Sequence, residues 1–338
     1  MAKLDPTTMS ATTSPAQEKQ RTVFAGRWRS VIQGYGALIA CVLLFILNCI
    51  FTPHFLSLQT VGLNLQQMST IAIVAIGMTL VIATGGIDLS VGSVMAIAGV
   101  LAPLIFLHLD TTLGIILSFI APLLIAAICG LFNGWLVARI RVQPIIATLI
   151  LFIAGRGIAQ VLTNGAGLPF TMPGFQWIGQ GSFLHIPIQA YIMLALVGLF
   201  VLIVQRTTFG RYLQATGGNA SAARLAGVPV TRTTWLAYGI SGVLAGLAGL
   251  IVVALNSNSD PSSVGLNYEL SAIAAVAIGG TPLIGGQARV FGTFVGALIT
   301  QLIYTILVGN NVPQAVALVV NAIIILAAVY IQTQRRKA

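Results

Sequence analysis

The sequence predicts an all-α integral membrane protein with about ten spanning helices, and three observations support this prediction. Apolar residues make up 57% of the 338 residues and charged residues only 7%, whereas soluble domains have about 45–50% and about 25%. Ten apolar segments approach the roughly 20 residues needed to cross a bilayer. Basic residues precede the first segment, follow the tenth, and lie between the fourth and fifth, sixth and seventh, and eighth and ninth. Because basic residues stay on the cytoplasmic side, both chain ends are expected in the cytoplasm.

The elements follow in order from this pattern. A polar N-terminal tail, 1–33, is expected to be mobile and cytoplasmic, and a short basic tail, 332–338, follows a transmembrane domain of 34–331. The expected spans are 34–52, 64–84, 89–108, 113–138, 143–163, 187–205, 233–255, 268–284, 289–308 and 312–331. Every basic residue except Arg156 lies outside these spans or, like Arg289, at the end of one, so membrane orientation explains the net charge of +10 and no nucleic acid is expected as a partner.

Glycines recur four positions apart within three of the spans, a spacing that lets helix backbones approach closely. The pairs are Gly130/Gly134, Gly242/Gly246 and Gly292/Gly296. Because the chain has 36 glycines, chance produces some such pairs, and the pattern alone does not assign helix contacts.

Two glycine-rich segments interrupt the apolar pattern, at 84–92 between the second and third spans and at 278–286 between the eighth and ninth. Unwound backbone at membrane depth is tolerated only where protein or a water-filled cavity satisfies its polar groups. Asp88, with Thr84 and Ser90 nearby, therefore has two interpretations. It lines or gates a pathway at a helix break, or it caps the third span in a tight turn on the inner side.

Arg156 is the one basic residue inside a predicted span, near the middle of the fifth. Burying a charge there costs roughly 2.5–3.5 kcal/mol on insertion scales, so its side chain is expected to reach a partner or a wet interior. The candidate partners are Asp88, Glu269 and helix-end carbonyls, and a structural ion pair is favoured over contact with a substrate. The neighbouring Gly155 and Gly157 would let another backbone approach.

The polar connection 206–232 is the longest cytoplasmic one after the tail. Within it Asn219 is a favoured N-cap, and Gly227 followed by Pro229 ends a helix, so the sequence predicts a two-turn cytoplasmic helix. Such a short helix is unstable alone and is expected to dock, either on a cytoplasmic partner as a coupling helix or on lipid, with the partner favoured. The residues assigned to this contact are Gly217, Gly218, Asn219, Ala222, Arg224, Leu225, Ala226 and Gly227.

Several catalytic patterns are absent from the chain. None of its lysines, Lys3, Lys19 and Lys337, follows a glycine-rich loop, so there is no Walker A motif. HExxH and GxSxG motifs and metal-ligand spacings are also missing. We therefore expect no enzymatic activity, no metal and no cofactor in this chain.

The segment from Gly77 to Ser93, GMTLVIATGGIDLSVGS, resembles the ribose-type sugar permeases of bacterial ABC importers. The resemblance continues through Phe132-Asn133-Gly134, Gln143-Pro144 with Ala147-Thr148-Leu149, Gly155-Arg156-Gly157 and Gly217–Gly227. It covers nearly the whole chain, and residues 147–160 are most similar to the galactofuranose-uptake permeases of this family.

The resemblance implies a multi-pass subunit of the bacterial inner membrane that works with several partners. These are a second permease subunit (another copy or a paired paralogue), a cytoplasmic ABC ATPase that binds ATP and Mg²⁺, a periplasmic sugar-binding protein, and membrane lipid. It also implies that Gly217–Gly227 contacts the ATPase, and that the outer connections 164–187 and 256–267 receive the binding protein.

A permease for a neutral monosaccharide, galactofuranose or a ribose-like sugar, needs hydrogen-bonding groups along a wet path and no fixed charge. The candidate pathway residues are Gln67, Thr84, Asp88, Ser90, Asn133, Thr148, Arg156, Gln160 and Thr281. The alternative is a stand-alone ion-coupled secondary transporter or channel, for which Asp88, Arg156 and Glu269 are the only plausible coupling groups.

Overall fold

The computed structural model describes residues 36–109 and 112–313, together with residues 315, 316, 319, 320, 322, 323 and 326. The predicted tails, 1–33 and 332–338, and much of the predicted tenth span lie outside the described residues.

Helices make up most of the described chain, which confirms the predicted all-α membrane class. The first runs from Gly36 to Phe51. The others are α2 (Leu58–Ala83), α3 (Val91–His108), α4 (Thr112–Trp135) with the π-helical turn η1 (Leu136–Ile140), α5 (Pro144–Leu162), α6 (Pro173–Gln180), α7 (Ile188–Arg206), α8 (Thr208–Gly218), α9 (Ala220–Leu225), α10 (Val230–Asn256), α11 (Tyr268–Ile278) and α12 (Val290–Gly309). The two-residue strands are β1 (Leu168–Pro169), β2 (Ser182–Phe183), β3 (Ile186–Pro187) and β4 (Asn258–Ser259). Seven of the described helices are long and apolar enough to cross a bilayer.

Most predicted span ends agree with the observed helices to within a few residues, and the two largest differences have local causes. Helix α2 begins well before the predicted start at 64 because the Ser57 hydroxyl accepts the Thr60 backbone N–H (3.1 Å) and caps it. Helix α11 ends at Ile278, before the predicted end at 284, where Gly279 and Gly280 begin a turn. With 11 residues, α11 rises about 16 Å, roughly half of the hydrocarbon core. It does not cross alone, and the described residues do not test the predicted count of ten spans.

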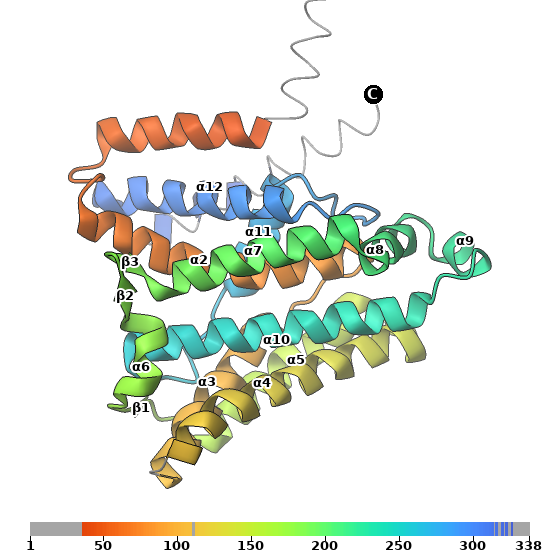
Figure 1. The fold of residues 1–338 in the computed structure, drawn as a ribbon, viewed down its shortest axis with the longest axis horizontal. Helices are drawn as coiled ribbons and strands as arrows, with labels where there is room; N and C mark the ends of the chain where they lie inside the picture. The colour runs from red at the N-terminus through yellow and green to blue at the C-terminus, as the bar shows by residue number, and fades with distance from the viewer. Residues whose placement is uncertain are drawn as a thin grey trace, which may run out of the picture.

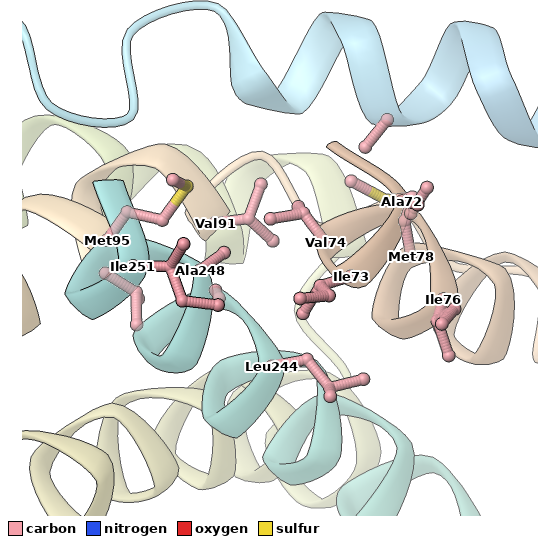
Figure 2. Packing of buried hydrophobic residues seen from close by; sticks show 14 of the residues in the cluster. Ala72, Ile73, Val74, Ile76, Met78, Val91, Met95, Leu244, Ala248 and Ile251 are labelled. Atoms are coloured by element: carbon pink, nitrogen blue, oxygen red, sulfur yellow. The ribbon is translucent and has the colours of Figure 1, made fainter. Parts of the chain in front are cut away.

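Helices α2, α3 and α10 form the centre of the bundle. Their apolar stretches are 72–78% buried, whereas those of α4, α5 and α7 are only 22–33% buried. Figure 2 shows Val74, Met95, Leu244 and Ile251 in the core where the three central helices meet. The outer helices therefore keep apolar faces that suit lipid or a second membrane subunit.

The predicted glycine pairs all lie at helix contacts. A Cβ on Gly130 would come within 3.1 Å of the Gly242 Cα, so α4 and α10 approach backbone to backbone. A Cβ on Gly296 would come within 2.9 Å of the Gly279 nitrogen at the end of α11. These contacts have no side chain between the backbones, so they hold the helices at short interaxial distance.

The two glycines beside Arg156 behave differently from each other. A Cβ on Gly155 would come within 2.9 Å of the Ser93 hydroxyl of α3, as expected for a close approach. Gly157 has no atom within 4 Å of the equivalent position among the described residues, so this chain itself makes no close approach there.

The connections gather at two opposite ends of the bundle (Figure 1). At one, which we call the strand end, β1 pairs with β4 and joins the segment 163–187 to the segment 257–267. At the other, the α9 end, the last turn of α8 lies beside the segments 84–90 and 279–289, and α9 extends beyond it. The outer connections of the predicted topology are thus at the strand end, and the arginine-bearing ones at the α9 end. Helices α6 and α8 were not predicted.

Candidate functional site

Both glycine-rich breaks meet α8 at the α9 end, although they are far apart in the sequence. The Gly286 backbone N–H donates to the Ala83 carbonyl oxygen (3.1 Å), which joins the end of α2 to the segment after α11. A Cβ on Gly217, in the last turn of α8, would overlap that oxygen and come within 2.6 Å of the Gly286 nitrogen. Gly85 and Gly285 have φ values of 87° and 93°, which L-residues rarely adopt. We call Gly85, Gly217, Gly285 and Gly286 the glycine junction; it connects three segments through backbone alone.

Helix α9 follows the glycine junction and points away from the bundle (Figure 1). The Asn219 side-chain oxygen accepts the backbone N–H groups of Ser221 (3.1 Å) and Ala222 (3.0 Å), which confirms the predicted N-cap. Ala223 is buried, whereas Leu225 is 92% exposed, more than any other large apolar side chain in the described chain. Burial of a leucine side chain contributes about 1.5–3 kcal/mol, so α9 gains stability if a partner covers Leu225.

A recess of about 190 Å³ opens beside α9, between η1, α8 and the start of α10. Its lining includes Thr84 and Gly86 from the first break. A Cβ on Gly86 would overlap the Tyr238 hydroxyl, and Tyr238 lies about two turns into α10. The break is therefore set back from the α9 end, behind the ends of α4 and α10, and is reached through the recess.

The recess carries positive charge and an unsatisfied hydroxyl. Arg141 and Arg224 line it, and both are exposed. The Thr216 hydroxyl also belongs to the lining and is buried without a hydrogen-bond partner among the described residues. The recess thus offers hydrogen-bond donors to a hydrogen-bond acceptor that enters from the α9 end.

Asp88 lies in a buried hydrogen-bond network that links the first break to α4 and α10. Its carboxyl accepts the Ser90 backbone N–H (3.0 Å), the Ser90 hydroxyl (2.6 Å) and the Ser241 hydroxyl (3.0 Å). The Asn133 side-chain amide donates to the Ser90 hydroxyl (2.8 Å). Ser90, not Asp88, occupies the N-cap position of α3. Protein donors therefore satisfy Asp88 in this conformation, and it fits neither predicted interpretation fully.

Arg156 of α5 hydrogen-bonds to the 257–267 segment at the strand end. One guanidinium nitrogen donates to the Pro261 carbonyl (2.9 Å) and the Val264 carbonyl (2.5 Å) of the 257–267 segment. Gln160, one turn later, donates to the Ser262 hydroxyl (3.4 Å). These acceptors are loop carbonyls, neither the favoured carboxylates of Asp88 and Glu269 nor helix-end carbonyls, so the prediction named the wrong partners for Arg156. Arg156 and Gln160 both bind the same loop.

Gln67 lies in a separate polar contact between α2 and α12. It accepts the Gln301 side-chain amide (2.9 Å), which also donates to the Asn64 oxygen (3.0 Å). Thr305 donates to the same Asn64 oxygen. Polar side chains that bond across helices in this way stabilise packing within a membrane.

Two of the last three candidates bond within their own segments, since the Thr84 hydroxyl donates to the Val81 carbonyl (2.7 Å) and the Thr148 hydroxyl to the Pro144 carbonyl (3.0 Å). Thr148 also reaches the first break, where its hydroxyl donates to the Ile87 carbonyl (3.4 Å). The Thr281 hydroxyl accepts the backbone N–H at the start of α12 (3.1 Å). Of the three, only Thr84 lines the recess.

A known protein family accounts for most of the chain. The family described as "Branched-chain amino acid transport system / permease component" matches residues 62–329. The chain belongs to this permease family.

Curated relatives of the permease are sugar transport proteins. The galactofuranose transporter permease protein of Escherichia coli (strain K12) is 39% identical over 323 residues, which cover 91% of this chain and 91% of the relative. The ribose import permease protein of Bacillus subtilis (strain 168) is 40% identical over 323 residues, 94% and 97% of the two chains. That of Escherichia coli (strain K12) is 38% identical over 304 residues, 89% and 94%. No solved structure matches the chain. The resemblance found in the motifs is thereby confirmed.

In the permease, the nine predicted pathway residues do not converge on one site. Asp88, Ser90 and Asn133 form one network, and Thr148 bonds to the neighbouring Ile87 carbonyl. The others lie at the strand end, between α2 and α12, in the recess or before α12. Their role in a pathway stays a prediction. Within the described residues, no group of three His, Cys, Asp or Glu side chains suits a metal ion.

Sequence reasoning missed Ser241 and Arg141. Ser241 directly precedes Gly242, a glycine of one of the predicted close helix contacts. Its position beside that contact is the sequence signal that could have identified it. Arg141 was counted only as a cytoplasmic charge, and nothing in the sequence places it with Arg224 in one recess.

Proposed function

We propose that the permease is the membrane-spanning subunit of an ATP-driven ABC importer that takes up a monosaccharide such as galactofuranose or a ribose-like sugar. The relatives at 38–40% identity are galactofuranose and ribose permeases, whereas the family description refers to branched-chain amino acids. The charged side chains of Asp88 and Arg156 hydrogen-bond to protein groups in the described chain, so neither is free to bind the charges of an amino acid. This favours a neutral sugar.

The observation that carries the ATP-driven part of the proposal is the exposed apolar surface of α9. A capped helix of six residues with a 92% exposed leucine suits insertion into a groove of a cytoplasmic partner better than contact with water. The proposed partner is an ABC ATPase, which would bind ATP and Mg²⁺ because this sequence has no Walker A motif. The recess with Arg141 and Arg224 lies beside the same surface and suits acidic side chains of that partner.

The glycine junction supplies a route from α9 to the membrane helices. When the ATPase displaces α9, α8 moves with it, and Gly217 is in direct contact with Ala83 and Gly286. Both breaks then move together with the ends of α2 and α11. Because α2 belongs to the central helices, this displacement would tilt the core and alternate the access of the pathway between the two sides.

Two other surfaces, the strand end and the outer faces of α4, α5 and α7, suggest the remaining partners. The strand end, formed by the paired segments 163–187 and 257–267, would receive a periplasmic sugar-binding protein. The apolar outer faces of α4, α5 and α7 would contact lipid and a second permease, either another copy or a paired paralogue. With these partners, the chain would lie in the bacterial inner membrane with the α9 end in the cytoplasm.

The test is co-purification of the ATPase with variants of one exposed leucine. Leu225→Asp should weaken association roughly tenfold to a hundredfold, the equivalent of one buried leucine. Leu184→Asp is the matched control, because Leu184 is 75% exposed at the strand end and should leave association unchanged. Equal recovery of the ATPase with both variants would remove α9 from the contact.

A further inference from the structure

A second cavity lies at the α9 end, between η1 and the first turns of α10. It has a volume of about 210 Å³ and is lined by Trp135, Ala138, Arg139, Thr231, Arg232 and Trp235. The end of α4 and the following η1 contribute Trp135 and Arg139, and α10 contributes Arg232 and Trp235. It adjoins the recess beside α9, with which it shares Ala138 and Thr231, but the recess holds a different pair of arginines, Arg141 and Arg224.

The two indole rings are held in place by neighbouring groups. The Trp235 ring N–H donates to the Leu131 carbonyl (2.8 Å). Trp135 stacks on Phe132, with ring centroids 6.2 Å apart and planes at 27°. Trp135 is nevertheless 44% exposed and Trp235 is 40% exposed. The cavity therefore has a preformed apolar wall that remains open to a ligand.

The two arginines have no carboxylate partner in the described chain. Both are exposed. Of the described acidic residues, Asp88 is bound to serines, and Asp260 and Glu269 belong to the segments around Arg156 toward the strand end. Two unpaired cations beside an apolar wall suit a ligand that is both anionic and apolar.

We propose that this cavity binds the headgroup region of an anionic phospholipid. The phosphate would contact Arg139 and Arg232, while the glycerol and first methylenes would pack on Trp135 and Trp235. The predicted inner interface is where tryptophan rings and basic side chains meet anionic headgroups. A soluble phosphate would leave the indole wall uncovered, which favours a lipid. This proposal does not depend on the nature of the transported substrate or on the ATPase.

The test is native mass spectrometry of the purified permease titrated with phosphatidylglycerol or phosphatidylcholine. Wild-type protein should retain phosphatidylglycerol at one site and phosphatidylcholine much more weakly. The double variant Arg139→Gln/Arg232→Gln should bind phosphatidylglycerol about thirty-fold more weakly. The matched control is Arg206→Gln/Arg211→Gln, which removes the same charge from exposed arginines outside the cavity and should bind as wild type does.

Quenching of tryptophan fluorescence by brominated lipids measures lipid binding at the cavity without changing any arginine. Brominated phosphatidylglycerol should quench wild type at lower mole fraction than brominated phosphatidylcholine, and Trp235→Phe should reduce that difference. Equal binding by the two double variants, or equal quenching by both lipids, would overturn the proposal. So would displacement of the lipid by inorganic phosphate, or cross-linking that shows a second permease chain covering the cavity.

Discussion

The tightest contact in the proposed route is at Gly217, so Gly217→Ala tests it most sharply. The added methyl group would overlap the Ala83 carbonyl oxygen and approach the Gly286 nitrogen to 2.6 Å. Both neighbours are backbone atoms and cannot turn aside as a side chain can. Overpacking of this kind costs about 1–3 kcal/mol, which the chain would relieve in part by moving α8 away from the two breaks.

Gly218 provides the matched control, because it is the next residue and a Cβ there meets nothing within 4 Å among the described residues. Replacing glycine by alanine in a helix stabilises the folded protein by about 0.5–1 kcal/mol, and both variants gain this stabilisation. The difference between their free energies of unfolding therefore isolates the overlap, about 1–3 kcal/mol.

The assay for this pair combines unfolding in mixed detergent micelles with ATP-driven sugar uptake in proteoliposomes. Gly217→Ala should be the less stable variant and should bind the ATPase through an unchanged α9 while transporting sugar slowly. Gly218→Ala should transport as wild type does. If the two variants have the same stability and the same uptake, the glycine junction does not transmit motion.

Three further predictions follow from the other contacts. Arg156→Leu leaves two loop carbonyls without their donor. A hydrogen bond from a charged group contributes about 1.5–3 kcal/mol to stability, so uptake or expression should fall. Full uptake with normal expression would show that the 257–267 segment does not depend on Arg156. Asp88→Leu leaves buried donors unsatisfied, at about 1–3 kcal/mol each, and should lower stability more than Ser241→Ala does in the same unfolding assay; the reverse order would contradict the network. The Ser262 N–H and Ser263 hydroxyl, with Arg156 nearby, hold the pKa of Asp260 below its usual range. The stabilisation from Asp260 is then present above about pH 4 and lost only as pH falls further. The effect of Asp260→Asn on uptake should therefore be the same at every pH between about 5 and 8, and a titration step in that range that the variant removes would contradict this.

The sequence predicted those features that depend on neighbouring residues. Span ends follow from apolar length and from punctuation by glycine and proline, which is why α5 and α7 were placed within a residue or two. The cap at Asn219 was predicted because its acceptor and donors lie within three residues of each other. Local rules of this kind need no knowledge of the tertiary fold.

Contacts between distant segments were not predictable from one sequence. The two breaks and Gly217 meet through backbone atoms, and backbone contacts leave no residue type that identifies the partner. The partners of Arg156 are likewise carbonyls, which every residue carries. Helix α8 was missed because its residues, Thr208–Gly218, are polar and include three glycines, a composition typical of loops, and packing on the neighbouring helices overrides that preference.

The central claim is that an ATPase outside this chain drives sugar through it. The most direct measurement is uptake of radiolabelled sugar into proteoliposomes that contain the permease with its co-purified ATPase and the binding protein. We predict uptake that requires ATP hydrolysis and stops when the ATPase is omitted or ATP is replaced by a non-hydrolysable analogue. Accumulation by the permease alone under an ion gradient would contradict the account and favour an ion-coupled transporter, in which Glu269, whose buried carboxyl oxygen has no hydrogen-bond partner among the described residues, would be the first coupling group to examine.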